Sequence, residues 1–395
     1  MPGKMSAASP GALLALIRER GGLTRQELLS ETGMARSTLM TRLDLLITHG
    51  LIHEARHLVS RGRPASVLSP DTTDRVALAI DIGHHKATAA VYDLAGHCLA
   101  EHVLALDDAP LPTLVDRLLI HGSQLLGALP SLRLVGVGLA IPAPVDTHTG
   151  VRMSSVALPD RSFPLTDAIA GHFGVDVVVE NDARALALGS ALEVPPLDDD
   201  SVLIGVKFST GIGVGLITGN HIMRGTNGTA GDLGHLQVTP GTGPVCTCGR
   251  RGCLAAYASG RALVDALGRA DVPTVTELAA LYDEGDDDVC RLIHQAAATL
   301  GRNLGGLIQV ASPQYVVFGG VLGGRPSITE RVIAEIRPAV SDRIDGQTRY
   351  SVVNSDRTTG RGLVQMVADH YFDPDRIDAN LSVGPDARSI SSDRT

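Results

Sequence analysis

Aromatic residues are scarce in this chain of 395 residues: they make up 3 % of it, and tryptophan is absent. This scarcity argues against the aromatic stacking platforms of proteins that bind single-stranded nucleic acid. No run of about 18 apolar residues could span a membrane, and the N-terminal region lacks the basic-then-apolar pattern of a secretory signal. We therefore expect a soluble cytoplasmic protein whose cores are built from Ala, Val, Leu and Ile.

Cysteine is also rare, because the chain has five, an odd number that does not favour a disulfide framework. Three of them lie close together at Cys246, Cys248 and Cys253, and His235 precedes this group by eleven residues. Three thiolates and one imidazole form the closed, tetrahedral donor set of a structural zinc site. The alternative is a group of buried free thiols, which would be reactive in the cytoplasm. We predict that these four residues bind Zn²⁺.

The net charge of −9 is unevenly distributed along the chain. Residues 1–66 contain nine Lys and Arg but five Asp and Glu, a net charge of +4 that leaves −13 for the remainder. A basic N-terminal segment joined to an acidic body is compatible with a DNA-binding domain fused to a second domain.

The N-terminal segment has the pattern of a helix-turn-helix. A helix is expected over residues 10–20, ended by Gly21 and Gly22, and Thr24 with Glu27 forms a capping box at the start of a second helix. Gly33 ends that helix with a tight turn, and a third helix is expected over about residues 35–47. This is the helix-turn-helix arrangement, in which a short turn joins two helices and the second begins with polar and basic residues. That second helix enters the major groove.

An extended stretch begins at residues 50–52, and residues 56–68 have a two-stranded pattern whose tip is basic, as in the wing of a winged helix-turn-helix. We predict a DNA-binding domain over residues 1–70 that contacts duplex DNA through Arg25, Arg36, Ser37, Thr38, Met40, Thr41, Arg42, Arg61, Gly62 and Arg63. The alternative is a three-helix packing domain with a solvated face. Because a two-fold operator requires two recognition helices, DNA binding would imply a homodimer or homotetramer.

The body of the chain has an α/β pattern in which polar residues follow buried strands. We expect an α/β domain over residues 71–374 and a disordered tail over 375–395. The expected strands cover residues 76–80, 86–92, 134–141, 175–179, 201–207 and 315–318, and the expected helices cover 254–268, 275–282 and 289–311.

A series of motifs in this body resembles the ROK family (repressor, ORF, kinase) in order and spacing. The motifs are ALAIDIG at 77–83, GLAIPAPVD at 138–146, ENDARALALG at 180–189, STGIGVG at 209–215, GTNGTAGDLGH at 225–235, CTCGRRGCL at 246–254 and VVFGGVL at 316–322. The resemblance implies a two-lobed, actin-like ATPase fold of the sugar-kinase type, with zinc at the four positions named above. Together with the N-terminal domain, it implies a DNA-binding transcriptional regulator, a repressor of carbohydrate uptake or metabolism genes.

The resemblance also bears on whether the chain is an enzyme. Asp182 matches the catalytic base of the family's sugar kinases, which removes the proton from the attacking hydroxyl. The phosphate loop that reads DIGGT in those kinases is altered here, because His84 and His85 replace its Gly and Thr. Their bulk should weaken ATP binding, so we expect no kinase activity. The alternatives are an ATP-dependent sugar kinase and a DNA-binding regulator that responds to no ligand.

For the effector, the resemblance implies sugar contacts at Asn181, Asp182, Asp232 and His235. Asp232 is one methylene shorter than the Glu of the family, and Ala157 and Ala255 stand where the family has Asn and a second Glu. Two explanations remain open. Either the pocket binds a different sugar or sugar derivative, or the body has lost its sensing role and serves as a scaffold for dimerisation.

Overall fold

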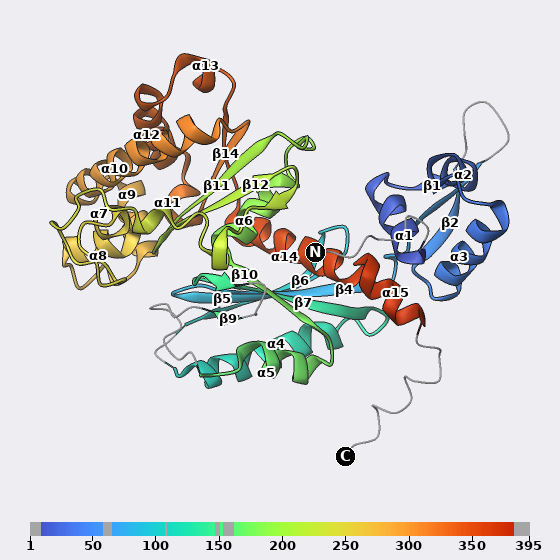
Figure 1. The fold of residues 1–395 in the computed structure, drawn as a ribbon. Helices are drawn as coiled ribbons and strands as arrows, with labels where there is room; N and C mark the ends of the chain where they lie inside the picture. Colours follow the sequence, from blue (N-terminus) through green and yellow to red (C-terminus); the bar gives the residue numbers. More distant parts are fainter. Residues whose placement is uncertain (1–8, 58–64, 107–108, 147–150, 153–161, 383–395) are drawn as a thin grey trace. The chain divides into compact units, whose positions relative to one another are not determined.

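The computed structural model describes residues 9–57, 65–106, 109–146, 151–152 and 162–382. The chain forms two compact units (Figure 1). Unit 1 consists of Met1–Arg75 together with Ala368–Thr395, and unit 2 consists of Val76–Val367. Within the described residues, no helix has both the length and the apolar character needed to cross a bilayer.

Unit 1 contains the expected three helices, followed by a hairpin that joins a three-stranded antiparallel sheet in the order β1-β3-β2. Its elements are α1 (Pro10–Glu19), β1 (Leu23–Thr24), α2 (Arg25–Thr32), α3 (Arg36–Thr48), β2 (Ile52–His57) and β3 (Ala65–Pro70). The predicted capping box is confirmed, since Thr24 and Glu27 bond reciprocally at the start of α2. Gly33 ends α2 with φ 63°, a left-handed conformation that favours glycine. The wing tip with Arg61, Gly62 and Arg63 lies outside the described residues.

A C-terminal segment completes unit 1. The chain returns at Ala368, in the last turn of α14 (Ser355–Tyr371), and continues into α15 (Pro374–Ser382). Helix α15 packs against α1, where Asp378 Oδ1 accepts a hydrogen bond of 2.7 Å from the Gly11 amide. The expectation of a disordered tail from residue 375 is therefore wrong for residues 375–382, and residues 383–395 lie outside the described part. The boundaries of the compact units also differ from the expected domains at 70 and 374.

Unit 2 is built on two five-stranded sheets with the same strand order. The first has the order β10-β7-β4-β5-β6 and the second β13-β12-β11-β14-β15, so each places its third strand at one edge and its fifth at the other. The first sheet consists of β4 (Arg75–Ile82), β5 (Lys86–Asp93), β6 (Cys98–Ala105), β7 (Arg133–Ile141) and β10 (Val177–Asn181). The second consists of β11 (Val202–Phe208), β12 (Ile212–Thr218), β13 (His221–Ile222), β14 (Tyr315–Gly319) and β15 (Arg349–Val352). A short hairpin joins β8 (Val145–Asp146) and β9 (Val151–Arg152).

Helices bury the faces of both sheets. Helices α4 (Leu111–Gly127) and α5 (Leu165–Phe173) cover one face of the first sheet, and α6 (Asp182–Ala191) lies between the sheets (Figure 1). Every residue of α6 is buried, and a Cβ at Gly205 or Gly215 would lie 2.6 or 2.4 Å from the Ala187 side chain. These glycines let β11 and β12 approach α6 closely, which fixes Asp182 at the inner end of the helix.

The second sheet carries the remaining helices, which enclose the largest apolar core. They are α7 (Leu254–Ala258), α8 (Gly260–Leu267), α9 (Val275–Glu284), α10 (Asp287–Ala311), α11 (Gly320–Gly323), α12 (Pro326–Ile336) and α13 (Asp342–Asp345). The single helix expected over 254–268 is wrong, because Ser259 adopts an extended conformation with ψ 150° and caps α8 through its hydroxyl. Ser, like Thr and Asp, favours a cap over a helix interior.

Candidate functional site

The N-terminal part of α3 presents most of the residues predicted to contact DNA. Arg36, Ser37, Thr38 and Thr41 are exposed, whereas Met40 and Arg42 are partly buried. An exposed row of polar and basic side chains at the start of a helix can donate hydrogen bonds to phosphates and base edges.

Arg25 differs from the other predicted DNA contacts. It lies at the start of α2, and its guanidinium makes a two-point ion pair with Glu54 on β2, with Nη2 2.9 Å from Oε2. This pair joins α2 to β2.

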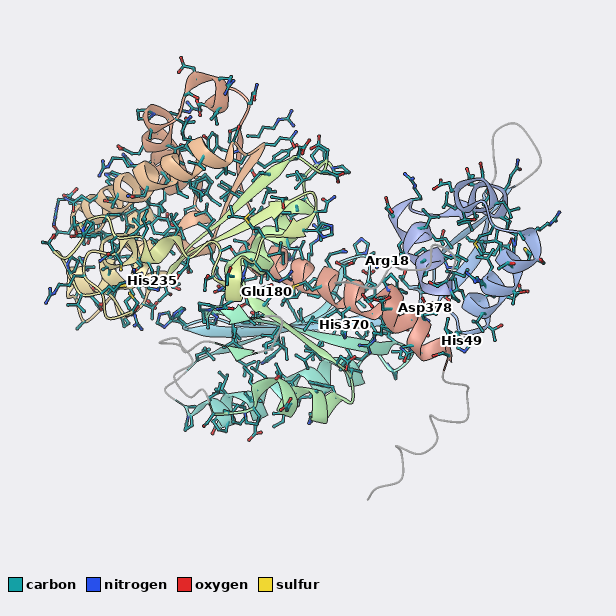
Figure 2. The ribbon with its side chains drawn as sticks, viewed as in Figure 1. Arg18, His49, Glu180, His235, His370 and Asp378 are labelled. Atoms are coloured by element: carbon teal, nitrogen blue, oxygen red, sulfur yellow. The ribbon has the colours of Figure 1, made fainter. Side chains whose placement is uncertain are left out.

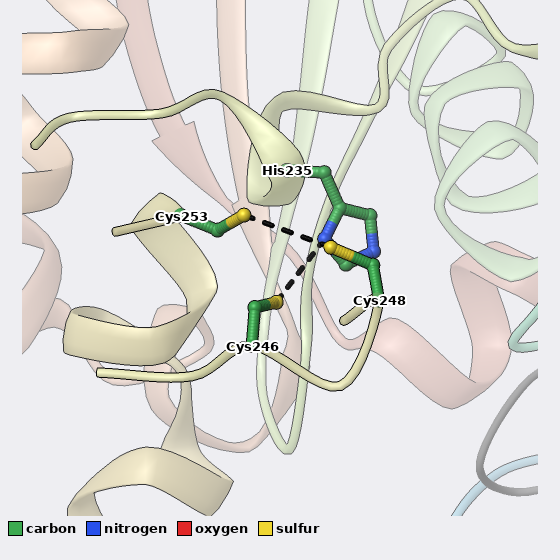
Figure 3. Close-up of side chains that lie close together, drawn as sticks. All are labelled: His235, Cys246, Cys248 and Cys253. Atoms are coloured by element: carbon green, nitrogen blue, oxygen red, sulfur yellow. Dashed lines mark hydrogen bonds between the residues drawn. The ribbon is translucent and has the colours of Figure 1, made fainter. Parts of the chain in front are cut away.

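Four side chains predicted to bind metal meet in one cluster in unit 2 (Figure 3). His235 comes from a short 3₁₀ turn, Cys246 and Cys248 from the glycine-rich loop, and Cys253 from the N-cap of α7. Their ligating atoms all lie within 4.8 Å of one another: His235 Nδ1 is 3.4 Å from Cys246 Sγ, and Cys248 Sγ is 3.7 Å from Cys253 Sγ. The cluster could therefore hold a metal ion.

Contacts within the loop also lower the pKa of one thiol of the cluster. Burial would raise the pKa of Cys248, but hydrogen bonds from the backbone and side chain of Arg250 and from the two other thiols lower it to about 6. Burial raises the pKa of Cys253. Because metal binding requires deprotonated thiols, the Arg250 contacts favour the metal-bound form. Arg250 also donates a hydrogen bond of 3.0 Å to the His235 carbonyl, which holds the loop against the histidine.

A cavity of about 1600 Å³ in unit 2 has walls from both sheets. The four residues predicted to contact a sugar, Asn181, Asp182, Asp232 and His235, all line it. Ala255, at one of the departures from the family pattern, lines it as well, whereas Ala157 lies outside the described residues. The structure thus brings the predicted ligand residues into one concave site. Figure 2 labels His235 within this unit.

Asn181 and Asp182 begin α6, and both are held by hydrogen bonds within the protein. The Asn181 side-chain oxygen caps the helix by accepting from the Ala183 and Arg184 amides, and its Nδ2 donates to the Ala143 carbonyl. The Asp182 Oδ2 accepts from Lys207 Nζ at 2.8 Å. These bonds fix the direction of both side chains before any ligand binds.

Lys207, on β11, was not predicted from the sequence. Its side chain is 16 % exposed and pairs with Asp182, whose side chain is 13 % exposed. Burial would lower the pKa of Lys207, but the carboxylates of Asp182 and Asp81 outweigh it and raise that pKa. Lys207 is therefore charged at neutral pH and forms an ion pair with Asp182, in which Nζ lies 2.8 Å from Oδ2.

A second buried ion-pair group also escaped sequence reasoning. Glu180, labelled in Figure 2, is fully buried; it forms an ion pair of 3.0 Å with Arg184 Nε and accepts a hydrogen bond of 3.0 Å from Arg224 Nε. Arg224 begins the loop that leads to Asp232, so the pair anchors that loop to the end of β10. The only sequence signal would be the i,i+4 spacing of Glu180 and Arg184.

The loop with His84 and His85, which the resemblance predicts to be an altered phosphate loop, lies between β4 and β5 and lines the same cavity. Burial lowers the pKa of His84 to about 4, so this imidazole is neutral at physiological pH. Burial raises the pKa of Asp81, whose Oδ1 is buried without a hydrogen-bond partner among the described residues. Lys86 pairs with Asp356 at the start of α14.

The comparisons with known proteins agree with this architecture. The xylose repressor of Bacillus subtilis (strain 168) is 27 % identical over 379 residues, which cover 91 % of this chain and 95 % of that protein. A solved ROK family transcriptional regulator, a homologue of the E. coli MLC protein, superposes with a TM-score of 0.74 at 24 % identity and covers 94 % of this chain and 98 % of its own. A ROK hexokinase from Thermus thermophilus superposes with a TM-score of 0.58 at 29 % identity over 73 % of this chain and 97 % of its own.

These structural neighbours confirm the predicted actin-like ATPase fold of the body. The ROK family model matches residues 77–368, which is most of the chain and nearly all of unit 2. The protein therefore belongs to the ROK family.

Proposed function

We propose that the protein is a cytoplasmic DNA-binding transcriptional regulator that represses carbohydrate genes and responds to a sugar or sugar derivative. The observation that carries the proposal is the joining of two parts in one chain. Unit 1 has the elements of a winged helix-turn-helix with an exposed, basic start of α3, and unit 2 is a ROK body with an open cavity. A repressor aligns with 91 % of the chain.

The DNA contacts follow from this layout. Helix α3 enters the major groove with Arg36, Ser37, Thr38 and Thr41 at its leading end, and the wing residues 61–63 reach the adjacent backbone or minor groove. Because one chain supplies one recognition helix, a two-fold operator requires a homodimer or homotetramer.

The effector binds in the cavity of unit 2. Asn181, Asp182, Asp232 and His235 supply hydrogen bonds to sugar hydroxyls, each of which would cost about 1–3 kcal/mol if it were buried without a partner. Closure of the cavity on the sugar changes the balance between DNA-binding and DNA-releasing states. A coupling of about 1–3 kcal/mol between the two sites is sufficient for a switch of roughly 5–150-fold in operator affinity.

The cluster of His235, Cys246, Cys248 and Cys253 binds a structural zinc ion. One imidazole and three thiolates form the closed donor set that zinc takes in structural sites, with Zn–S bonds of about 2.3 Å. Two sulfurs on such a tetrahedron lie about 3.8 Å apart by that geometry, and Cys248 and Cys253 are separated by 3.7 Å. Since His235 belongs to the metal cluster and to the cavity wall, zinc would order the part of the cavity that contacts the sugar.

A sugar kinase is the second candidate, because the body superposes on a ROK hexokinase and keeps Asp182. Two features argue against turnover. Lys207 forms an ion pair of 2.8 Å with the Asp182 carboxylate, and His84 and His85 stand where the family's kinases have Gly and Thr. A kinase would release ADP in the presence of a hexose, and this release would be lost in Asp182→Asn.

The test of the regulator proposal is selection of fragments from the organism's own genome by the purified, metal-loaded protein, followed by footprinting. We expect protection of a two-fold site beside transport or sugar-metabolism genes. Arg36→Ala should weaken binding to that site, whereas Arg302→Ala, which removes an exposed arginine from α10, should not. Retention of no fragment above salt-sensitive background would contradict the proposal.

A further inference from the structure

Three carboxylates in the cavity act on the ammonium group of Lys207. Asp81 comes from β4, Asp182 from the start of α6 and Asp356 from the first turn of α14, and all of them line the cavity, as Lys207 does. Burial would lower the pKa of Lys207, but these three carboxylates together raise it. Because the Lys207 side chain is 16 % exposed, salt screens the charges only weakly. We call Asp81, Asp182 and Asp356 the carboxylate cluster.

The carboxylate cluster has more negative charge than Lys207 can neutralise. Lys207 Nζ lies 2.8 Å from Asp182 Oδ2, but Asp81 Oδ1 is buried and has no hydrogen-bond partner among the described residues. Asp356 forms its own ion pair with Lys86, whose side chain is 47 % exposed. A buried carboxylate oxygen without a donor is costly, and a cation beside it lowers that cost. The cluster therefore attracts a cation, and a side chain of the protein supplies one.

The backbone fixes the position of this ammonium. Lys207 lies on the central strand of the second sheet, opposite Gly213 on β12 and Gly319 on β14. A Cβ at Gly213 would lie 2.8 Å from the Ala183 Cβ, and one at Gly319 would lie 2.8 Å from Ser355 Oγ. The two glycines let the starts of α6 and α14, which carry two of the three carboxylates, approach β11 closely. Lys207 is thus held at the carboxylate cluster from both sides.

A divalent metal ion is the other cation that such a cluster attracts. Carboxylate oxygens are ligands that Mg²⁺ and Mn²⁺ prefer, and phosphoryl transfer from ATP uses such an ion to bridge the phosphates. Lys207 is incompatible with this use of the cluster. Its Nζ already lies 2.8 Å from Asp182 Oδ2, and a metal ion placed beside it would meet a like charge in a weakly screened position.

We propose that Lys207 is a built-in cation that takes the place of a divalent metal ion at the carboxylate cluster, so that the cavity binds its ligand without such an ion. The inference goes beyond the regulator function, which does not specify any cation in the cavity. It also bears on the second candidate function, because metal-dependent phosphoryl transfer has no place for its ion while Lys207 is present. An ammonium has three N–H groups, so Lys207 can donate to a ligand oxygen as well as to Asp182.

The experiment is titration of the full-length, zinc-loaded protein with Mn²⁺, followed by the electron paramagnetic resonance signal of the free ion, with Mg²⁺ as competitor. Mn²⁺ prefers oxygen ligands to thiolates, so the cysteine cluster does not compete for it. We expect Lys207→Met to gain one Mn²⁺ site per chain, about ten-fold or more tighter than any site of the unaltered protein. The double variant Lys207→Met/Asp182→Asn should lose that site again, and Lys207→Arg, which keeps the charge, should not gain it.

Lys86→Met is the matched control. It removes the same charge from a lysine of the same cavity but leaves Lys207 in place, so it should gain no Mn²⁺ site. An equal gain in both methionine variants would show that only the net charge of the cavity matters, and it would overturn the proposal.

Two other results would also overturn the proposal. One is tight binding of Mn²⁺ by the unaltered protein that Mg²⁺ displaces and Asp182→Asn abolishes. The other is a folded Lys207→Met that gains no site. If Lys207→Met does not fold by itself, Mn²⁺ should restore its circular dichroism spectrum, and failure of this rescue would equally refute the built-in cation. The selection of DNA fragments tests the regulator function separately, because it requires no cation at the carboxylate cluster.

Discussion

Replacing Gly11 with alanine tests whether α15 is an integral part of unit 1. Gly11 lies in the first turn of α1, and an added Cβ would lie 2.1 Å from the Pro374 carbonyl oxygen, 2.7 Å from its carbon and 2.8 Å from its Cα. All three are backbone atoms, so no side-chain rotation relieves the clash and the start of α15 must move. In an exposed helix the same change would stabilise the fold by up to about 1 kcal/mol, so the sign of the effect is informative.

The expected magnitude follows from two contributions. Overpacking costs about 1–3 kcal/mol, and displacement of α15 also lengthens or breaks the 2.7 Å hydrogen bond from the Gly11 amide to Asp378. After allowance for the gain in helix propensity, we expect unit 1 to lose about 2 kcal/mol of unfolding free energy. In a unit of this size that corresponds to a fall of roughly 8–16 °C in its midpoint temperature.

The assay is hydrogen–deuterium exchange of the full-length protein, because it reports α1 and α15 separately from unit 2. Gly11→Ala should accelerate exchange in both helices and leave α10 unchanged. Gly306→Ala in α10 is the matched control, since nothing lies within 4 Å of its Cβ, and it should slow exchange there. If Gly11→Ala leaves α1 and α15 as protected as before, or protects them further, the packing of α15 on α1 is refuted.

Three further perturbations have defined outcomes. Chelation or Cys253→Ser should reduce bound zinc, measured by elemental analysis, to well below one ion per chain. Either change should also accelerate hydrogen–deuterium exchange across the loop from His235, whereas the control Cys98→Ser should retain the metal. Lys207→Met leaves the Asp182 carboxylate without its ion-pair partner and should lower the free energy of unfolding, measured with denaturant, by about 3 kcal/mol. The double variant with Asp182→Asn should recover part of this loss. The pKa of His84 is lowered to about 4 by burial, so the folded protein binds fewer protons there than the unfolded chain. The contribution of the neutral His84 to the free energy of unfolding is complete above about pH 6.5 and is lost as the pH falls to about 4. His84→Gln should therefore flatten the dependence of the unfolding free energy on pH in this range.

Local signals were sufficient to predict much of this fold. The capping box at Thr24 and the left-handed Gly33 are determined by residues within one turn, and both are present. The cluster with His235 was also predictable, because Cys246, Cys248 and Cys253 supply most of its donor atoms within one short loop.

Features that depend on distant contacts were not predictable in this way. Helix α15 is polar and buries Ile377, so its composition resembles that of a disordered tail until α1 is placed beside it. Lys207 is separated by 25 residues from Asp182, and a lone lysine in a strand pattern gives no indication of its partner. The break at Ser259 depends on the hydroxyl acting as a cap, which competes with helix continuation and is decided by packing.

The return of the chain to unit 1 at Ala368 has a consequence for the order of events during synthesis. Chains emerge from the ribosome with the N-terminus first, and domains commonly fold as they emerge. Here α1 is made long before its partner α15, because Asp378 lies 367 residues after Gly11 and follows the whole of unit 2. A chain released early would contain every residue of α2 and α3 and yet lack α15, the helix that packs on α1, so only a finished protein presents a complete unit 1.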